Sequence, residues 1–109
     1  MELKDLAKRY FDLFSKKDIN NLKILFSKDI VLKDWEIEAN GIIEVEEVNK
    51  KIFNSVKTIV ATPTNIYQDN SVLICVIDIL IDETEKLKVV DILKFNKNKK
   101  IEKISAFKQ

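Results

Sequence analysis

Hydrophobic positions along the chain recur first at the spacing of helices and later at the spacing of strands. Residues 3–14 carry apolar side chains three and four positions apart, which predicts one helical face: Leu3, Leu6, Ala7, Tyr10, Leu13 and Phe14. A second, shorter helix capped by Asp18 would bring together Ile19, Leu22, Leu25 and Phe26. A third helix, with acidic residues in its first turn, would bury Val45, Val48, Ile52, Phe53 and Val56.

An alternation of period two predicts strands before and after the third helix. It covers residues 30–35, and the Asn40-Gly41 pair that follows is the strongest turn signal in the chain. After residue 57 the pattern predicts four antiparallel strands: Thr58–Tyr67, Ser71–Ile81, Lys86–Phe95 and Lys100–Phe107. Pro63 indicates an edge position or a bulge. The order predicts a single α+β domain over residues 1–109, with three helices on one face of a curled sheet.

The central strands are apolar on both of their faces. In residues 72–81, for example, both alternating sets of side chains are almost entirely Val, Leu, Ile and Cys. One face can pack on the helices, but the other face also needs a cover, and the chain has no further element to supply one. We therefore expect a homodimer that pairs through the outer face of the sheet.

Composition narrows the possible chemistry. The chain has no histidine, which excludes catalytic relays and metal sites that use imidazole. Its one cysteine excludes an internal disulfide, and its one glycine excludes a glycine-rich phosphate-binding loop. A net charge of +1 and a single arginine, Arg9, disfavour nucleic-acid binding. The longest apolar run is too short to span a bilayer, and the first residues do not resemble a signal peptide. We expect no cofactor, no metal, no membrane or nucleic-acid partner, and a cytoplasmic location.

Four polar residues interrupt the apolar pattern and are the candidates for chemistry. Asp34, Asp78 and Asp91 lie within strand patterns, where aspartate is depleted, and Tyr10 lies on the apolar face of the first helix. Each also has an ordinary explanation: an aspartate at a sheet edge or in a salt bridge, and a core tyrosine bonded to a backbone carbonyl. For Asp78 the ordinary explanation, an edge position or a salt bridge with a neighbouring lysine, is the favoured interpretation.

Several segments together resemble the nuclear-transport-factor-2-like superfamily, in its SnoaL-like and ketosteroid-isomerase-like branch. The resemblance covers essentially the whole chain. It rests on these segments, in this order: Arg9-Tyr10-Phe11, Lys17-Asp18-Ile19, Leu25-Phe26-Ser27-Lys28-Asp29-Ile30, Leu32-Lys33-Asp34-Trp35, Gly41, Val89-Val90-Asp91-Ile92-Leu93-Lys94-Phe95 and Lys100-Ile101-Glu102-Lys103-Ile104.

This resemblance implies a cone, in which a curved antiparallel sheet wraps around three helices and a pocket opens at the wide end. It also implies dimers through the outer sheet face. By position, Asp34 matches the aspartate base of the ketosteroid isomerases, Tyr10 their donor tyrosine, and Asp91 their protonated acid. The side chains expected to line the pocket are Phe14, Trp35, Phe53 and Ile104.

The sequence departs from the family in ways that select among its activities. Trp35 stands where the isomerases carry proline, and Tyr67 is the only tyrosine besides Tyr10. The dehydratases of this fold use histidine, and the epoxide hydrolases use a strand arginine, whereas Arg9 lies in a predicted helix. The favoured function is therefore acid–base isomerisation or cyclisation of a small apolar carbonyl compound. The alternatives are a non-catalytic binder of such a ligand, or an assembly module that acts through its sheet face.

Overall fold

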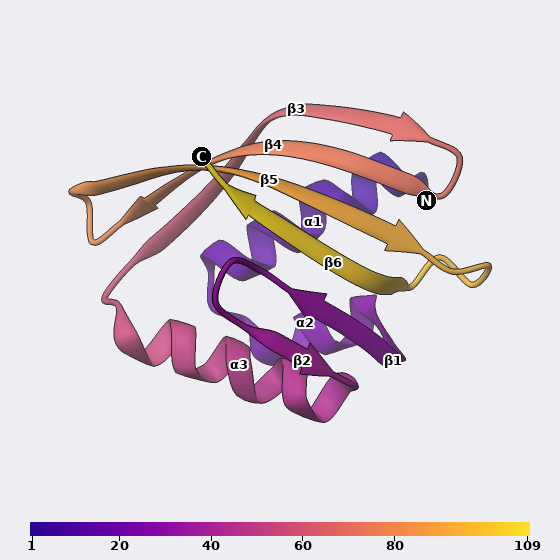
Figure 1. Ribbon diagram of the computed structural model, residues 1–109, viewed down its shortest axis with the longest axis horizontal. Helices are drawn as coiled ribbons and strands as arrows, with labels where there is room; N and C mark the ends of the chain where they lie inside the picture. Colours follow the sequence, from indigo (N-terminus) through magenta and orange to yellow (C-terminus); the bar gives the residue numbers. More distant parts are fainter.

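The computed structural model describes residues 1–109 and confirms the α+β cone: three helices lie against the concave side of one curved six-stranded sheet (Figure 1). The elements are α1 (Leu3–Ser15), α2 (Ile19–Leu25), β1 (Phe26–Lys33), β2 (Glu38–Asn40), α3 (Ile42–Ser55), β3 (Ile59–Asp69), β4 (Val72–Ile81), β5 (Glu85–Phe95) and β6 (Ile101–Lys108). None of the helices is long and apolar enough to cross a membrane.

The strand order is β2-β1-β6-β5-β4-β3, so the first and last long strands of the chain are neighbours. Strands β3 to β6 form the expected antiparallel meander, and their bounds agree with the predicted strands to within two residues. Strand β1 pairs with β6 in parallel, which is possible because the whole meander and α3 separate them in sequence. Pro63 is both on an edge strand and at a bulge, between residues 63 and 65.

The second helix is shorter than its apolar spacing predicts. Asp18 caps it as expected, because its side chain accepts a hydrogen bond from the backbone N–H of Asn21 at 3.2 Å. The prediction that Phe26 belongs to this helix is wrong, since Phe26 is the first residue of β1 and pairs with Ile101 of β6. Pairing with a distant strand therefore overrides the local helical period at this position.

The Asn40-Gly41 pair does not form the hairpin turn that it predicts. Asn40 ends the short strand β2, and Gly41, at φ 88°, is the N-cap of α3. The turn lies earlier, between β1 and β2, where the backbone N–H of Asp34 donates to the Ile37 carbonyl at 2.9 Å. Strand β2 escaped prediction because it has only three residues and is held by its pairing with β1.

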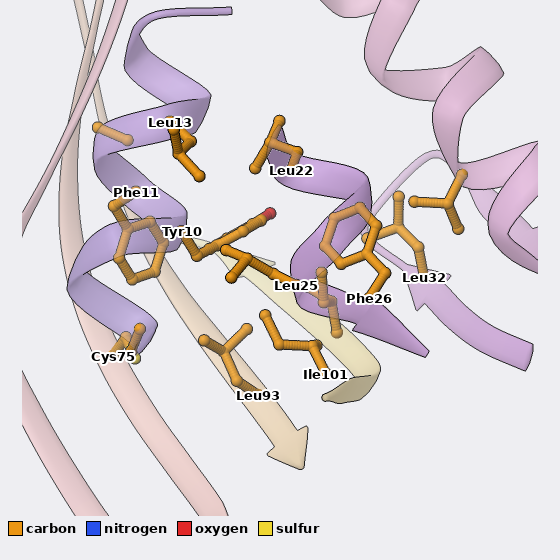
Figure 2. Packing of buried hydrophobic residues seen from close by; sticks show 14 of the residues in the cluster. Tyr10, Phe11, Leu13, Leu22, Leu25, Phe26, Leu32, Cys75, Leu93 and Ile101 are labelled. Atoms are coloured by element: carbon orange, nitrogen blue, oxygen red, sulfur yellow. The ribbon is translucent and has the colours of Figure 1, made fainter. Parts of the chain in front are cut away.

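The alternation along β4 separates a core face from an outer face. Leu73, Cys75 and Ile77 point toward the helices and are at most 1% exposed, whereas Ile74 and Asp78 point outward. Asp78 is paired there with Lys88 of β5 at 2.8 Å, which confirms the salt-bridge interpretation of this aspartate. The core between sheet and helices is rich in aromatic and branched side chains, including Tyr10, Phe11 and Phe26 (Figure 2).

Candidate active site

A cavity of about 220 Å³ lies between the helices and the concave face of the sheet. Of its 20 lining residues, 16 are hydrophobic, and the four others are Asp34, Glu36, Asn49 and Asp91. These four come from the turn after β1, from α3 and from β5. Such a space suits an apolar ligand that is oriented by a small number of polar contacts.

Asp91 is the most deeply buried of the acidic side chains in the cavity wall. It faces inward because it sits in register with Cys75 of β4 and Ala106 of β6, on the same face as its strand neighbours Val89 and Leu93. The residue is 7% exposed, and its carboxyl group forms no hydrogen bond with another protein group. Burial, followed by the negative charge of Asp34, raises the pKa of Asp91 to about 7. Near neutral pH the carboxyl group is therefore protonated in a large share of molecules and can donate a hydrogen bond.

Asp34 reaches the same cavity from the end of β1, where the strand turns toward β2. Its Oδ1 accepts hydrogen bonds from the backbone N–H groups of Glu36, at 2.8 Å, and Ile37, at 2.6 Å. These two bonds hold the carboxylate in place, while Oδ2 forms no hydrogen bond with the protein. Asp34 thus presents a fixed carboxylate with one oxygen available to a ligand.

Tyr10 also lines the cavity, from α1, and its ring lies in an aromatic group with Phe11, Phe14 and Phe26 at centroid distances of 5.0, 6.1 and 6.1 Å. Burial and the neighbouring Asp91 and Cys75 raise the pKa of Tyr10 well above its usual value, so the hydroxyl stays neutral. In Figure 2 this hydroxyl points toward the side of the core where Leu22 and Phe26 lie. It forms no hydrogen bond with Asp91, so its role as a donor stays a prediction.

Three of the four side chains expected to line the pocket do so: Phe14, Trp35 and Ile104. Phe53 does not, and this prediction is corrected. Its ring packs against that of Phe14 at 4.9 Å, nearly edge to face, and is 5% exposed. Phe53 therefore lies behind the cavity wall, where it packs against Phe14.

The sequence interpretation missed Asn49 and Glu36. Asn49 lies four residues after Val45 and four before Phe53, so it belongs to the buried stripe of α3 and is itself 4% exposed. It interrupts that stripe just as Tyr10 interrupts the stripe of α1, and this signal was available in the sequence. Glu36 carried no such signal, because its place in the wall depends on the turn after β1. No group of three His, Cys, Asp or Glu side chains is placed to hold a metal ion.

The architecture is shared with many solved structures. An NTF2-like protein of unknown function from Cytophaga hutchinsonii superposes with a TM-score of 0.85, at 9% identity over 100% of this chain and 91% of the other. A proposed SnoaL-like polyketide cyclase from Shewanella denitrificans gives 0.86, at 12% identity over 98% and 90%. A proposed ketosteroid isomerase from Kribbella flavida gives 0.86, at 16% identity over 98% and 77%.

The fold is therefore the one seen in NTF2-like proteins. No protein-family model and no curated protein matches the sequence. Identities of this size establish a common backbone and not a common reaction, because one fold can carry unrelated functions. The activity must therefore be argued from the groups in this cavity.

Proposed function

We propose that the cavity binds a small apolar molecule bearing a carbonyl group and catalyses proton transfer at the carbon beside that carbonyl. The observation that carries the proposal is the pair of carboxyl groups, Asp34 and Asp91, in one largely apolar cavity with unequal surroundings. Asp34 is held by two backbone amides, whereas Asp91 has no such donors and a pKa of about 7. Such a difference separates the base from the acid.

In this reaction the free Oδ2 of Asp34 removes a proton from the carbon next to the carbonyl. The electron pair of the broken C–H bond forms the enolate, and its negative charge develops on the carbonyl oxygen. The protonated carboxyl group of Asp91 donates a hydrogen bond to this oxygen, and Tyr10 is proposed as a second neutral donor. Where a C=C bond adjoins the deprotonated carbon, Asp34 returns the proton to the far carbon of that bond, and the double bond moves next to the carbonyl; this completes an isomerisation without any co-reactant. In a cyclase the enolate carbon instead attacks a second carbonyl of the ligand, and the alkoxide that forms takes up the proton held by Asp34.

The size of the cavity limits the ligand. An apolar protein cavity of about 150 Å³ holds benzene, and this cavity measures about 220 Å³. A compound with one or two rings therefore fits inside, whereas a four-ring compound would extend beyond the cavity. We propose a one- or two-ring ketone, or a linear compound of similar volume, as the ligand.

The bicyclic ketone 2-tetralone provides a direct test, because deuterium incorporation beside its carbonyl can be followed by NMR in D2O. We expect the protein to accelerate this exchange, and Asp34→Asn to reduce the protein-dependent rate about 100-fold or more, in line with general-base catalysis. Asp78→Asn is the matched control, since it makes the same change to a strand aspartate on the outer face. Equal exchange rates with wild type and Asp34→Asn would remove Asp34 from the chemistry.

A non-catalytic ligand binder is the second candidate. One observation favours it: the Oδ1 hydrogen bonds of Asp34 stabilise the turn after β1, which gives this residue a structural task in addition to any chemical one. If 2-tetralone binds to wild type and Asp34→Asn alike, and neither accelerates exchange, this second function is the correct one.

We also propose that two copies pair through the outer face of the sheet. Two neighbouring rows of side chains run across the strands on this face and are mostly apolar: Tyr67, Ile74 and Ile92 in one, and Val76, Val90 and Phe107 in the other. Tyr67, Ile74 and Phe107 are the large hydrophobic residues among them that are exposed. Charged side chains flank these rows, among them the Asp78–Lys88 pair. Sedimentation should give a dimer at micromolar concentration and a monomer for Ile74→Lys; a wild-type monomer would contradict the proposal. We further propose a cytoplasmic location, which suits the free thiol of Cys75.

A further inference from the structure

Asn49 is a polar side chain on the α3 wall of the cavity that the proposed reaction does not use. It is 4% exposed and lies between Val45 and Phe53 in the buried stripe of the helix. Glu44, Glu46, Lys50 and Ser55 form the side-chain hydrogen bonds and ion pairs of α3, whereas the amide of Asn49 forms none with another protein group. Oγ of Ser27 is the one side-chain polar atom that is both completely buried and without a hydrogen-bond partner. The unpaired polar atoms of Asn49 are therefore not completely buried. The amide of Asn49 therefore faces the cavity.

An unpaired amide at this position is unfavourable for the empty protein. Removing a polar group from water without giving it a partner costs stability, and an apolar side chain would complete the α3 stripe without that cost. The packing of α3 thus gives no reason for an asparagine at position 49. A hydrogen-bonding group brought by a ligand does give one.

Asn49 and Asp91 lie on different walls of the cavity. Helix α3 packs on α2, β1 and β2, whereas Asp91 belongs to β5. In Figure 1, α3 and β5 lie on opposite sides of the molecule's centre. A ligand that reaches both groups must therefore carry polar atoms at two separate places.

We infer that Asn49 forms a second polar subsite, which binds a hydroxyl or carbonyl oxygen of the ligand at the end remote from Asp91. This inference rests on the proposed binding of a small carbonyl compound in the cavity. An amide both donates and accepts hydrogen bonds, so it suits either kind of oxygen. A carboxylate or phosphate ligand is disfavoured, since the other polar lining residues, Asp34, Glu36 and Asp91, are all acidic. The ligand class is thus an uncharged one- or two-ring compound with oxygen groups at two ends.

Two naphthols that differ by one hydroxyl group test the subsite: 2-naphthol and 2,6-dihydroxynaphthalene. Calorimetric titration should show that the wild type binds the diol about three- to tenfold more tightly, the range expected for one additional neutral hydrogen bond. In Asn49→Leu the affinity for 2-naphthol should be unchanged. In this variant the diol should bind more tightly than 2-naphthol only by a statistical factor. That factor arises because the symmetric diol can bind in two equivalent orientations.

Asn54→Leu is the matched control, because it makes the same substitution on the exposed face of the same helix. It should retain the wild-type preference for the diol. Asn49→Leu should also be at least as stable as wild type in urea, whereas an asparagine with a structural role would lose stability on this change. If the Leu variant does not fold, Asn49→Ser takes its place in the binding experiment, with the same expected loss of preference.

The inference is overturned if Asn49→Leu keeps the full preference for the diol, or if the wild type shows none. Binding of neither naphthol would overturn it together with the proposed ligand cavity. If the diol preference depends on Asn49 but 2-tetralone shows no exchange dependent on Asp34, the subsite stands and only the proposed reaction fails.

Discussion

Asp34, in the turn after β1, and Asp91, in β5, line one cavity, and the negative charge of Asp34 helps to raise the pKa of Asp91 to about 7. Strand β6 lies between β1 and β5 in the sheet, so the two carboxyl groups approach each other across the concave face. Asp34 accepts two backbone hydrogen bonds, and Asp91 accepts none. Two side chains of one chemical type thus receive different properties from their surroundings.

The contribution of Asp91 to the stability of the protein should fall as pH rises from about 4 to about 7. Over this range the folded state keeps a proton on Asp91 that the unfolded chain releases, so each increase in pH favours unfolding. The contribution of Asp91 is fully present below pH 4 and lost above pH 7. The Asp91→Asn variant should therefore be more stable than wild type at pH 8, by up to about 4 kcal/mol, and close to it at pH 4. Urea unfolding curves between pH 4 and pH 8 measure this difference.

Other groups act in the opposite direction, so the difference between the two proteins is the informative quantity. Hydrogen bonds from Asn21 lower the pKa of Asp18, and a hydrogen bond from Lys23 lowers that of Glu46. These contributions are common to wild type and variant and cancel. A stability difference between wild type and Asp91→Asn that does not change with pH would contradict the raised pKa of Asp91.

Removing the charge of Asp34 should lower the pKa of Asp91 without returning it to its usual value. Burial is the larger cause of the shift and remains in Asp34→Asn, while the repulsion between the two carboxylates disappears. Carbon-detected NMR titration of the side-chain carboxyl of Asp91 gives the pKa in both proteins. Asp78→Asn, which removes an aspartate from the outer face, should leave the titration of Asp91 unchanged. An equal effect of the two substitutions would mean that the Asp34 charge does not act on Asp91.

The protein-dependent exchange of 2-tetralone should decline above about pH 7. Above that pH, Asp91 loses the proton with which it stabilises the enolate oxygen. In Asp91→Asn the side-chain amide still donates a hydrogen bond but does not titrate, so the decline at high pH should disappear while part of the rate remains. A wild-type rate that is constant from pH 6 to pH 9 would exclude Asp91 as the acid.

The hydroxyl of Tyr10 should matter for ligands and not for folding. It has no hydrogen-bond partner in the protein, so Tyr10→Phe should change the free energy of unfolding by less than about 1 kcal/mol. If the hydroxyl acts as the second donor, the same variant should reduce the rate of 2-tetralone exchange. A large loss of stability would indicate a structural hydrogen bond, and an unchanged exchange rate would remove Tyr10 from the reaction.

The thiol of Cys75 should be unreactive in the folded protein. Burial and the nearby Asp91 raise its pKa to about 12, and the residue has no exposed surface. Iodoacetamide at pH 8 should therefore modify it only after unfolding in urea, as followed by mass spectrometry. Rapid modification of the native protein would show that β4 opens locally around residue 75.

Local patterns in the sequence predict most of the elements correctly, for identifiable reasons. The spacing along α1 and the Asp18 cap are properties of a few consecutive residues, and so are the alternating strands of the meander. Pro63 marks an edge strand and a bulge because its ring removes a backbone donor wherever it occurs. Phe26 escapes such reasoning because its strand partner, Ile101, is distant in the chain. Strand β2 escapes it because three residues are too short for a visible alternation, and its pairing with β1 leaves Gly41 to begin α3 and not to form a hairpin turn.

The sequence by itself determined which residues break the apolar pattern: Asp34, Asp91 and Tyr10 stand out without any structure. Only the tertiary structure decided that they share a cavity, that Asn49 belongs to it, and that Phe53 lies behind its wall. The physical reason is that polarity and periodicity are local, whereas burial and charge coupling depend on the parallel contact between β1 and β6. That contact joins the first strand of the chain to the last and brings the turn after β1 to the same face as Asp91.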